Sequence, residues 1–141
     1  MVGKLQTNKV KFALQIFDYI HSVDSEKLAR KIADEQNKMN KKIKIFLQVN
    51  IGDENQKSGI NKNEVGQLVS FSEEIGLNVI GLMCIPPVDS DPESYFVEMH
   101  KLNKDLGLAE LSMGMSSDYL IAAKNFSTYV RIGSSIFGQR Y

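Results

Sequence analysis

Short apolar segments alternate with amphipathic helical patterns along the whole chain. The clearest apolar segment, residues 43–49, is rich in β-branched residues and ends at Asn50, as a buried strand does. Each such segment is followed by a stretch whose apolar residues recur at helical spacing. Strands at intervals of roughly 20 to 35 residues, separated by helices, predict a parallel sheet with helical crossovers. The five predicted strands are residues 17–21, 43–49, 77–83, 109–112 and 128–132.

Capping residues set the expected ends of the helices between these strands. The first helix is expected to have its N-cap at Asp24 or Ser25, because short side-chain oxygens accept bonds from free backbone N–H groups. A later helix is expected to follow Asp91, since Pro92 fits the first helical position. We predict helices over residues 26–40, 62–75, 92–107 and 116–125, with further helix-compatible apolar spacing at Leu5, Val10 and Leu14.

Two loops of glycine and hydroxyl residues follow the last two predicted strands. The first is Ser112–Asp118, in which Ser116 and Asp118 are placed to open the next helix, and the second is Val130–Ser135. Glycines let backbone N–H groups approach a ligand, hydroxyls add donors, and a helix start favours negative charge. Taken alone, each loop is more simply interpreted as an ordinary turn between a strand and a helix, with a capping residue at the helix start. Together, with Arg131 between them, they predict a phosphate-sized cup.

Two architectures fit the alternation of strands and helices. A five-stranded doubly wound sheet suits the length, whereas a (β/α)8 barrel needs about 200 residues or more, so this chain would form only part of one. In barrels, phosphate sites are often built by the last two loops, and the two glycine-hydroxyl loops are the last two here. In doubly wound nucleotide binders the glycine-rich loop follows the first strand, but the turn at residues 22–25 has no glycine. We therefore predict a partial (β/α)8 barrel.

Length and charge narrow the classes of function. The 141 residues are enough for one domain with a single core, and no linker divides them. Seventeen basic and seventeen acidic residues cancel, so the sequence carries no electrostatic footprint for nucleic acid or an acidic membrane surface. Because Cys84 is the only cysteine, no internal disulfide can form, which favours a reducing cytosol. No apolar run approaches the ~20 residues of a membrane span.

Other residues that suggest chemistry have simpler interpretations. His21 and His100 are far apart, with no cysteine or carboxylate at ligand spacing, which argues against a metal site. Ser112, Ser116 and Ser117 lack a plausible histidine partner nearby, which weakens a hydrolase interpretation. Cys84 follows an apolar strand and is expected to be a small core residue.

Five segments in a fixed order carry a resemblance to a known family. Together they resemble the pyridoxal 5'-phosphate (PLP) homeostasis proteins, whose fold is similar to the N-terminal barrel domain of alanine racemase. The resemblance extends over nearly the whole chain. The segments are Gly3–Lys9, Gln48–Asn50 with Glu54–Gly59, Gly81–Pro86, Leu111–Asp118 and Val130–Gly138.

The resemblance implies PLP as the cofactor and a role for each residue of the cup. Ser116 and the backbone of Met115 would form one wall, Gly133 and Ser134 the other, and Arg131 would face the pyridine nitrogen. An arginine does not give up a proton, so it would leave that nitrogen unprotonated and weaken PLP as an electron sink. The family therefore implies a PLP-binding protein of PLP homeostasis and not an enzyme. Without the resemblance, an ion pair at a strand end is the simpler interpretation of Arg131.

The resemblance also implies that the chain corresponds to the C-terminal two-thirds of a family member. The first barrel strands of the family, which include the lysine that forms the Schiff base with PLP, have no counterpart in this chain. Lys57 is the candidate substitute for that lysine, although a solvated loop lysine is its simpler interpretation. An open barrel exposes strand edges and its inner face, so we expect self-association through those edges. Three alternatives stay open: a flavodoxin-like phosphoester-binding domain, an amino-acid racemase fragment, and a fragment without a ligand.

Overall fold

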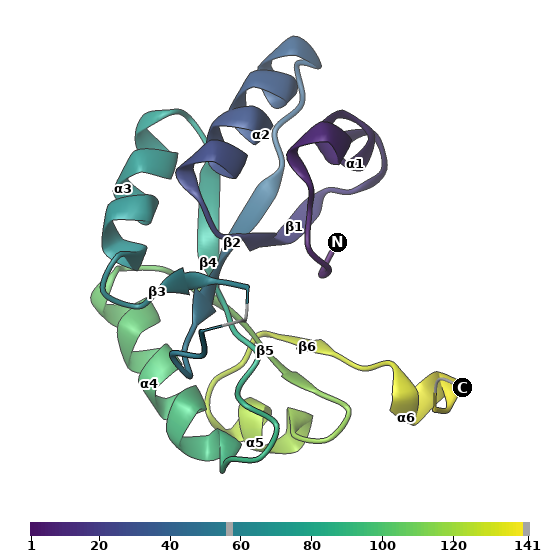
Figure 1. Cartoon of the computed structure of the whole chain (residues 1–141), viewed down its shortest axis with the longest axis vertical. Coiled ribbons are helices and arrows are strands. Elements are labelled where there is room, and N and C mark those ends of the chain that lie inside the picture. The colour runs from purple at the N-terminus through teal and green to yellow at the C-terminus, as the bar shows by residue number, and fades with distance from the viewer. Residues whose placement is uncertain (56–57, 140–141) are drawn as a thin grey trace.

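The strands form one parallel, strongly curved sheet (Figure 1). The computed structural model describes residues 1–55 and 58–139. Five strands are neighbours in the order in which they occur along the chain, and a sixth, very short strand pairs with the second of them. They are β1 (Tyr19–Val23), β2 (Lys44–Asn50), β4 (Asn78–Met83), β5 (Glu110–Met115) and β6 (Tyr129–Arg131), with β3 (Ile60–Asn61) beside β2.

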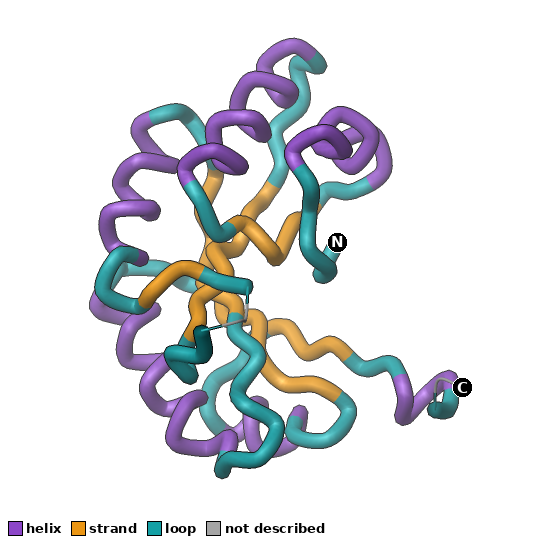
Figure 2. The backbone as a smooth tube through the Cα atoms, in the orientation of Figure 1, coloured by secondary structure: helices purple, strands orange, loops and turns teal. Residues whose placement is uncertain are grey.

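The helices cover the convex side of this sheet (Figures 1 and 2). The four helices that connect successive strands line the outside of the curve, whereas the last helix projects away from the rest of the chain. The helical elements are η1 (Thr7–Lys9), α1 (Val10–Ile16), α2 (Glu26–Lys38), α3 (Val65–Glu74), α4 (Pro92–Asp105), α5 (Tyr119–Lys124) and α6 (Ser134–Phe137).

The strand order decides between the two predicted architectures. A doubly wound sheet reverses its strand order and carries helices on both faces. Here the order β1-β2-β4-β5-β6 follows the chain without reversal. The sheet curves so far that the rings of Tyr19 in β1 and Tyr129 in β6 meet at 5.8 Å, although three strands lie between them. The predicted partial barrel is confirmed, and the doubly wound alternative is wrong.

The two faces of the sheet bury different kinds of residue. On the convex side, Ile45, Leu47 and Val49 of β2 belong to the hydrophobic core, together with apolar residues of the helices. Because side chains alternate along a strand, Phe46 points the other way, into the barrel, where it is fully buried and stacks on His21. The expectation of an exposed inner face is therefore wrong around His21 and Phe46, because aromatic rings from β1, β2 and β6 pack against one another there.

Several predicted boundaries are confirmed by capping contacts. The Oγ atom of Ser25 accepts a hydrogen bond from the Leu28 N–H at 3.2 Å, so Ser25 is the N-cap of α2. Pro92 is the first residue of α4, and the Asp91 carboxylate accepts a bond from the Glu93 N–H at 3.2 Å. The apolar residues Leu5, Val10 and Leu14 are all buried, and the last two lie on α1.

Other boundaries differ from the prediction. β1 begins two residues later, because the Phe17 N–H donates to the Ala13 carbonyl and closes α1, so pairing with β2 starts only at Tyr19. β5 continues three residues further and ends at Met115, which leaves the first loop to start at Ser116. α3 begins at Val65 and not at residue 62. β3 and α6 were not predicted, since elements of two and four residues have no periodicity to detect.

Candidate functional site

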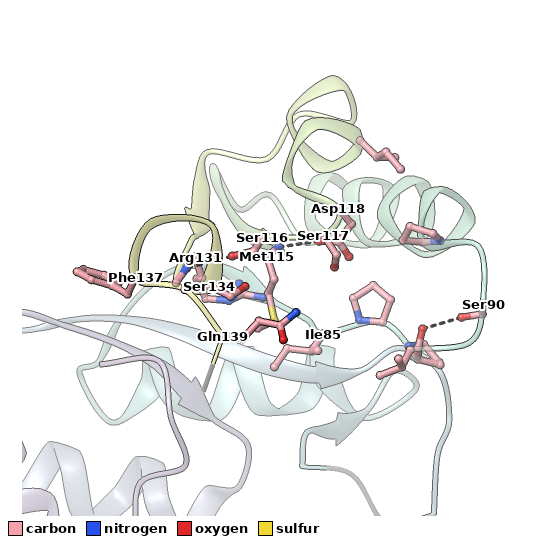
Figure 3. A pocket seen from close by; sticks show the side chains of 17 residues that line it. Ile85, Ser90, Met115, Ser116, Ser117, Asp118, Arg131, Ser134, Phe137 and Gln139 are labelled. Carbon is pink, nitrogen blue, oxygen red and sulfur yellow. Dashed lines mark hydrogen bonds between the residues drawn. The ribbon is translucent and has the colours of Figure 1, made fainter. Parts of the chain in front are cut away.

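A cavity of about 960 Å³ opens at the carboxyl ends of β4, β5 and β6. In a parallel barrel the strands aim their carboxyl ends at one face of the molecule, and ligands bind there. Figure 3 shows the side chains that line the cavity. All five residues of the predicted cup are among them: Met115, Ser116, Arg131, Gly133 and Ser134.

Ser116 joins the two loops of the predicted cup. Its Oγ atom accepts hydrogen bonds from the Gly133 N–H at 3.1 Å and from the Ser135 N–H at 3.3 Å. A hydroxyl that accepts two bonds keeps its own proton free to donate. In the described residues the hydroxyl of Ser134 makes no side-chain hydrogen bond, so it also remains available to a ligand in the cavity.

The expectation that Ser116 and Asp118 open the next helix is confirmed only for Asp118, which is the N-cap residue of α5 but makes no side-chain capping bond. Helix α5 starts at Tyr119, and no side chain caps its first turn. The Asp118 carboxylate instead turns back and accepts the Met115 N–H at 2.6 Å, while the Ser116 hydroxyl is held by the amides of the second loop. Both side chains thus fix the geometry of the cavity wall and not the start of α5.

Arg131 is held in place by β4 and β5. Its Nη1 atom donates to the Oγ of Ser112 at 2.7 Å, and its Nη2 atom donates to the Cys84 carbonyl at 2.8 Å. Burial lowers the pKa of Arg131, but a guanidinium remains charged at any pH in which the protein is folded. In the described part of the chain Arg131 makes no ion pair, so the simpler interpretation as a strand-end ion pair is not what the structure shows.

His21 lies beneath this arginine, and sequence reasoning missed it. Its Nδ1 atom is 2.7 Å from the Oγ of Ser112, so the expectation that no histidine accompanies the serines is wrong. The imidazole stacks on Phe46 at 4.3 Å, and burial, the Met1 amino group and Arg131 lower its pKa to about 4. Ninety-one residues separate His21 from Ser112, and no local sequence pattern connects residues so far apart.

The Ser112–His21 pair does not form a hydrolase site. Ser112 is fully buried, and its Oγ accepts a bond from Arg131 as well as contacting His21. A nucleophilic hydroxyl must be able to reach the substrate. It also needs a neighbouring base that can take up its proton. A buried hydroxyl that is already held by a guanidinium cannot do so, and the pair instead supports Arg131.

The remaining candidate residues have structural surroundings or lie outside the described part. Cys84 is fully buried, as predicted, and burial raises the pKa of its thiol to about 12. Lys57 lies outside the described residues. Over residues 1–55 and 58–139, no cluster of three or more His, Cys, Asp or Glu side chains could hold a metal ion. Within the same ranges, none of the helices has both the length and the apolar character needed to cross a membrane.

The fold and the position of the cavity define the chain as part of a parallel α/β barrel with its site at the carboxyl ends of the strands. The family described as "Alanine racemase, N-terminal domain" matches residues 1–141, and the chain belongs to that family. The predicted resemblance to the pyridoxal phosphate homeostasis proteins is confirmed: such a protein from Aquifex aeolicus is 37% identical over 99% of this chain. The one from Escherichia coli K12 is 34% identical over 99% of it. The chain spans 65% and 63% of these two relatives.

Solved structures agree with this family. PipY of Synechococcus elongatus PCC7942, with PLP bound, has a TM-score of 0.88 and 31% identity, and the match covers 96% of this chain and 68% of PipY. Alanine racemase of Clostridium difficile 630 has a TM-score of 0.74 at 15% identity, with 98% of this chain and 38% of that chain covered. At that identity the racemase shows the shared fold alone.

Proposed function

We propose that this chain binds PLP in the cavity at the ends of β4, β5 and β6, as part of a protein of PLP homeostasis. One observation carries the proposal: a mostly buried arginine without an ion pair in the described residues lies in the same cavity wall as the hydroxyls of Ser116 and Ser134. The two partners of Arg131, the Ser112 hydroxyl and the Cys84 carbonyl, are neutral, so an electron-rich group of a ligand would be a further favourable partner for the buried charge. The PLP bound to PipY and the names of the curated relatives support the same ligand.

The donors of the cavity fit a phosphate group. Ser116 has a free proton, and Ser134 has an unengaged hydroxyl on the facing loop. The hydroxyls of Ser116 and Ser134 thus supply donors from two loops that Ser116 already holds together, while Met115 and Gly133, whose N–H groups are engaged by Asp118 and Ser116, contribute the shape of the wall. Phosphate oxygens accept such charge-assisted bonds strongly. We assign Met115, Ser116, Gly133 and Ser134 to the phosphate.

Arg131 is assigned to the pyridine ring of the cofactor. PLP, when bound, acts as an electron sink for carbanions, and it does so best when its ring nitrogen is protonated. Arg131 can donate hydrogen bonds but does not release a proton, so it keeps a facing ring nitrogen unprotonated. We therefore propose that the chain holds PLP without acting as an enzyme.

The buried thiol of Cys84, the only cysteine in the sequence, favours a reducing compartment such as the cytoplasm.

Binding through the described residues is noncovalent and therefore weak. No lysine is among the described residues that line the cavity. A few charge-assisted bonds of ~1.5–3 kcal/mol each must offset the ordering cost of binding, so we expect an affinity in the millimolar to high-micromolar range. Pyridoxamine 5'-phosphate should then compete with PLP almost equally well, and inorganic phosphate should compete about tenfold more weakly because it lacks the ring that contacts Arg131.

Isothermal titration of the chain with PLP and inorganic phosphate tests this proposal. Ser134→Asp should abolish binding of both, because it places a negative charge against the phosphate. Ser70→Asp adds the same charge on the exposed side of α3 and should leave binding unchanged. Tight PLP binding that phosphate does not compete with would contradict the noncovalent site.

We also propose that the chain associates with itself through the open end of the barrel. In the described residues β6 pairs only with β5, which leaves its other edge free. Val130 on this strand and Ile136 and Phe137 on α6 are exposed, the last of them 86%. A free parallel edge beside apolar side chains favours pairing with another chain.

A further inference from the structure

Three side chains from three different strands form a line of hydrogen bonds beneath the cavity. Arg131 of β6 donates to Ser112 of β5, and Ser112 in turn contacts His21 of β1. Both bonds measure 2.7 Å. Ser112 is fully buried and His21 is 6% exposed, so water does not compete for either bond.

The chemistry of the three groups fixes the direction of these bonds. A guanidinium only donates, so the Ser112 Oγ accepts from Arg131. The single Ser112 proton is then directed to the Nδ1 atom of His21, its second partner. If Nδ1 donated instead, the Ser112 proton would have no acceptor among the described residues, so we infer that Nδ1 is unprotonated and that the imidazole carries its proton on Nε2.

The surroundings of His21 keep its ring neutral. The charged groups that face it are Arg131 and the Met1 amino group, and both oppose a further positive charge. The rings of Phe46 and Tyr129 pack on it at 4.3 and 5.7 Å and exclude water. Burial and these charges together lower the pKa of His21 to about 4, so the imidazole is neutral at neutral pH, and the contact with Ser112 decides which nitrogen carries the proton.

Arg131 is held at two points of its guanidinium plane. Nη1 is fixed by Ser112 and Nη2 by the Cys84 carbonyl. Two fixed nitrogens prevent the plane from rotating about the Nε–Cζ bond and aim its free edge at the cavity. Loss of one anchor leaves the group free to turn about the other.

We propose that Ser112 and His21 are positioning residues for Arg131: the neutral imidazole orients the Ser112 hydroxyl, and that hydroxyl fixes the guanidinium against the cofactor ring. The inference rests on the proposed function for its ligand. Its structural part, the orientation of Arg131 by the two residues, exists in the ligand-free protein. The experiment therefore has one arm without PLP and one with it.

The arm without PLP uses nitrogen NMR on the ligand-free chain. We expect His21 to be the Nε2–H tautomer throughout pH 5 to 8 and Arg131 to show two separate Nη signals because its rotation is restricted. Ser112→Ala should merge the two Arg131 signals and release His21 into a mixture of tautomers. Ser72→Ala is the matched control, since Ser72 is also fully buried but its hydroxyl has no partner in the described residues. An Nδ1–H tautomer, or a single averaged Arg131 Nη signal in the unmodified chain, would overturn the inference.

The arm with PLP measures affinity in the same variants. Ser112→Ala and His21→Leu should each weaken PLP binding about tenfold and leave inorganic phosphate within twofold, because the phosphate cup does not use Arg131. His21→Asn keeps an acceptor near the Nδ1 position and should restore most of the PLP affinity. Equal loss for PLP and phosphate, or no rescue by His21→Asn, contradicts positioning. If the unmodified chain fails to bind PLP, the proposed function is wrong, and the NMR arm still decides the orientation of Arg131.

Discussion

A single added methyl group at Gly114 should damage the wall of the site. It lies in β5 with φ of 97°, a region that L-residues rarely adopt. A Cβ atom there would lie 2.6 Å from the Cβ of Ala122 and 3.0 Å from the Cα of Tyr119, both on α5. The left-handed backbone costs ~1–2 kcal/mol, and the overpacking of a buried contact adds ~1–3 kcal/mol. We expect Gly114→Ala to lower the free energy of unfolding by ~2–5 kcal/mol.

Gly76→Ala separates the two contributions. Gly76 also has a positive φ, of 84°, but an added Cβ meets nothing within 4 Å, so only the backbone term remains. Urea denaturation of both variants should show Gly114→Ala to be the less stable by ~1–3 kcal/mol, with unchanged m-values. Equal destabilisation of the two variants would refute the reasoning, because it would mean that α5 moves away from β5 without cost.

Three further predictions test the site and its support. Arg131→Gln should weaken PLP binding about tenfold in calorimetric titrations while phosphate affinity stays the same, and an equal loss for both ligands would assign Arg131 to the phosphate. Folding lowers the pKa of His21 from 6.5 to about 4, so the free energy of unfolding should be at its full value above pH 6.5 and fall by up to ~3 kcal/mol as the pH decreases to 4. Urea denaturation at a series of pH values measures this decrease. His21→Gln should reduce the pH dependence, and a variant with an unchanged curve contradicts the prediction. Sedimentation should show concentration-dependent association of the chain. The association should weaken when Ile136 and Phe137 are both replaced by lysine. A monomer at all concentrations would rule out association through β6 and α6.

The fold could be predicted because its evidence is local and repeated. Each strand segment and each helix segment shows its own periodicity, and their alternation implies parallel pairing whatever the exact boundaries. Errors arose where one element runs into the next. The apolar Phe17 suggested an early start for β1, although its N–H closes α1, and Met113 and Met115 extend β5 into a segment whose glycine and serines suggested a loop.

The residues that line the cavity could be predicted for a different reason. Loops after parallel strands share one end of the barrel, so two hydroxyl-rich loops on neighbouring strands must lie close together wherever the strands begin. Composition therefore sufficed to find the two loops, whereas the assignment of Ser116 and Ser134 within them to the phosphate came from the family resemblance. Composition did not reveal that the Ser116 hydroxyl bonds to the other loop, because a side chain near a helix start has the same sequence pattern whether it caps its own helix or a neighbouring loop.

His21 shows what sequence periodicity leaves undetermined. The predicted strand 17–21 and β1 both contain His21. The sequence therefore placed His21 on the first strand but did not identify its neighbour. The contact with Ser112 depends on how tightly the sheet curves, and that curvature is set jointly by the packing of Phe46 and Tyr129 inside the barrel and of the helices outside it. Because such a contact spans the barrel and leaves no pattern along the chain, support for a binding residue is harder to predict than the binding residue itself.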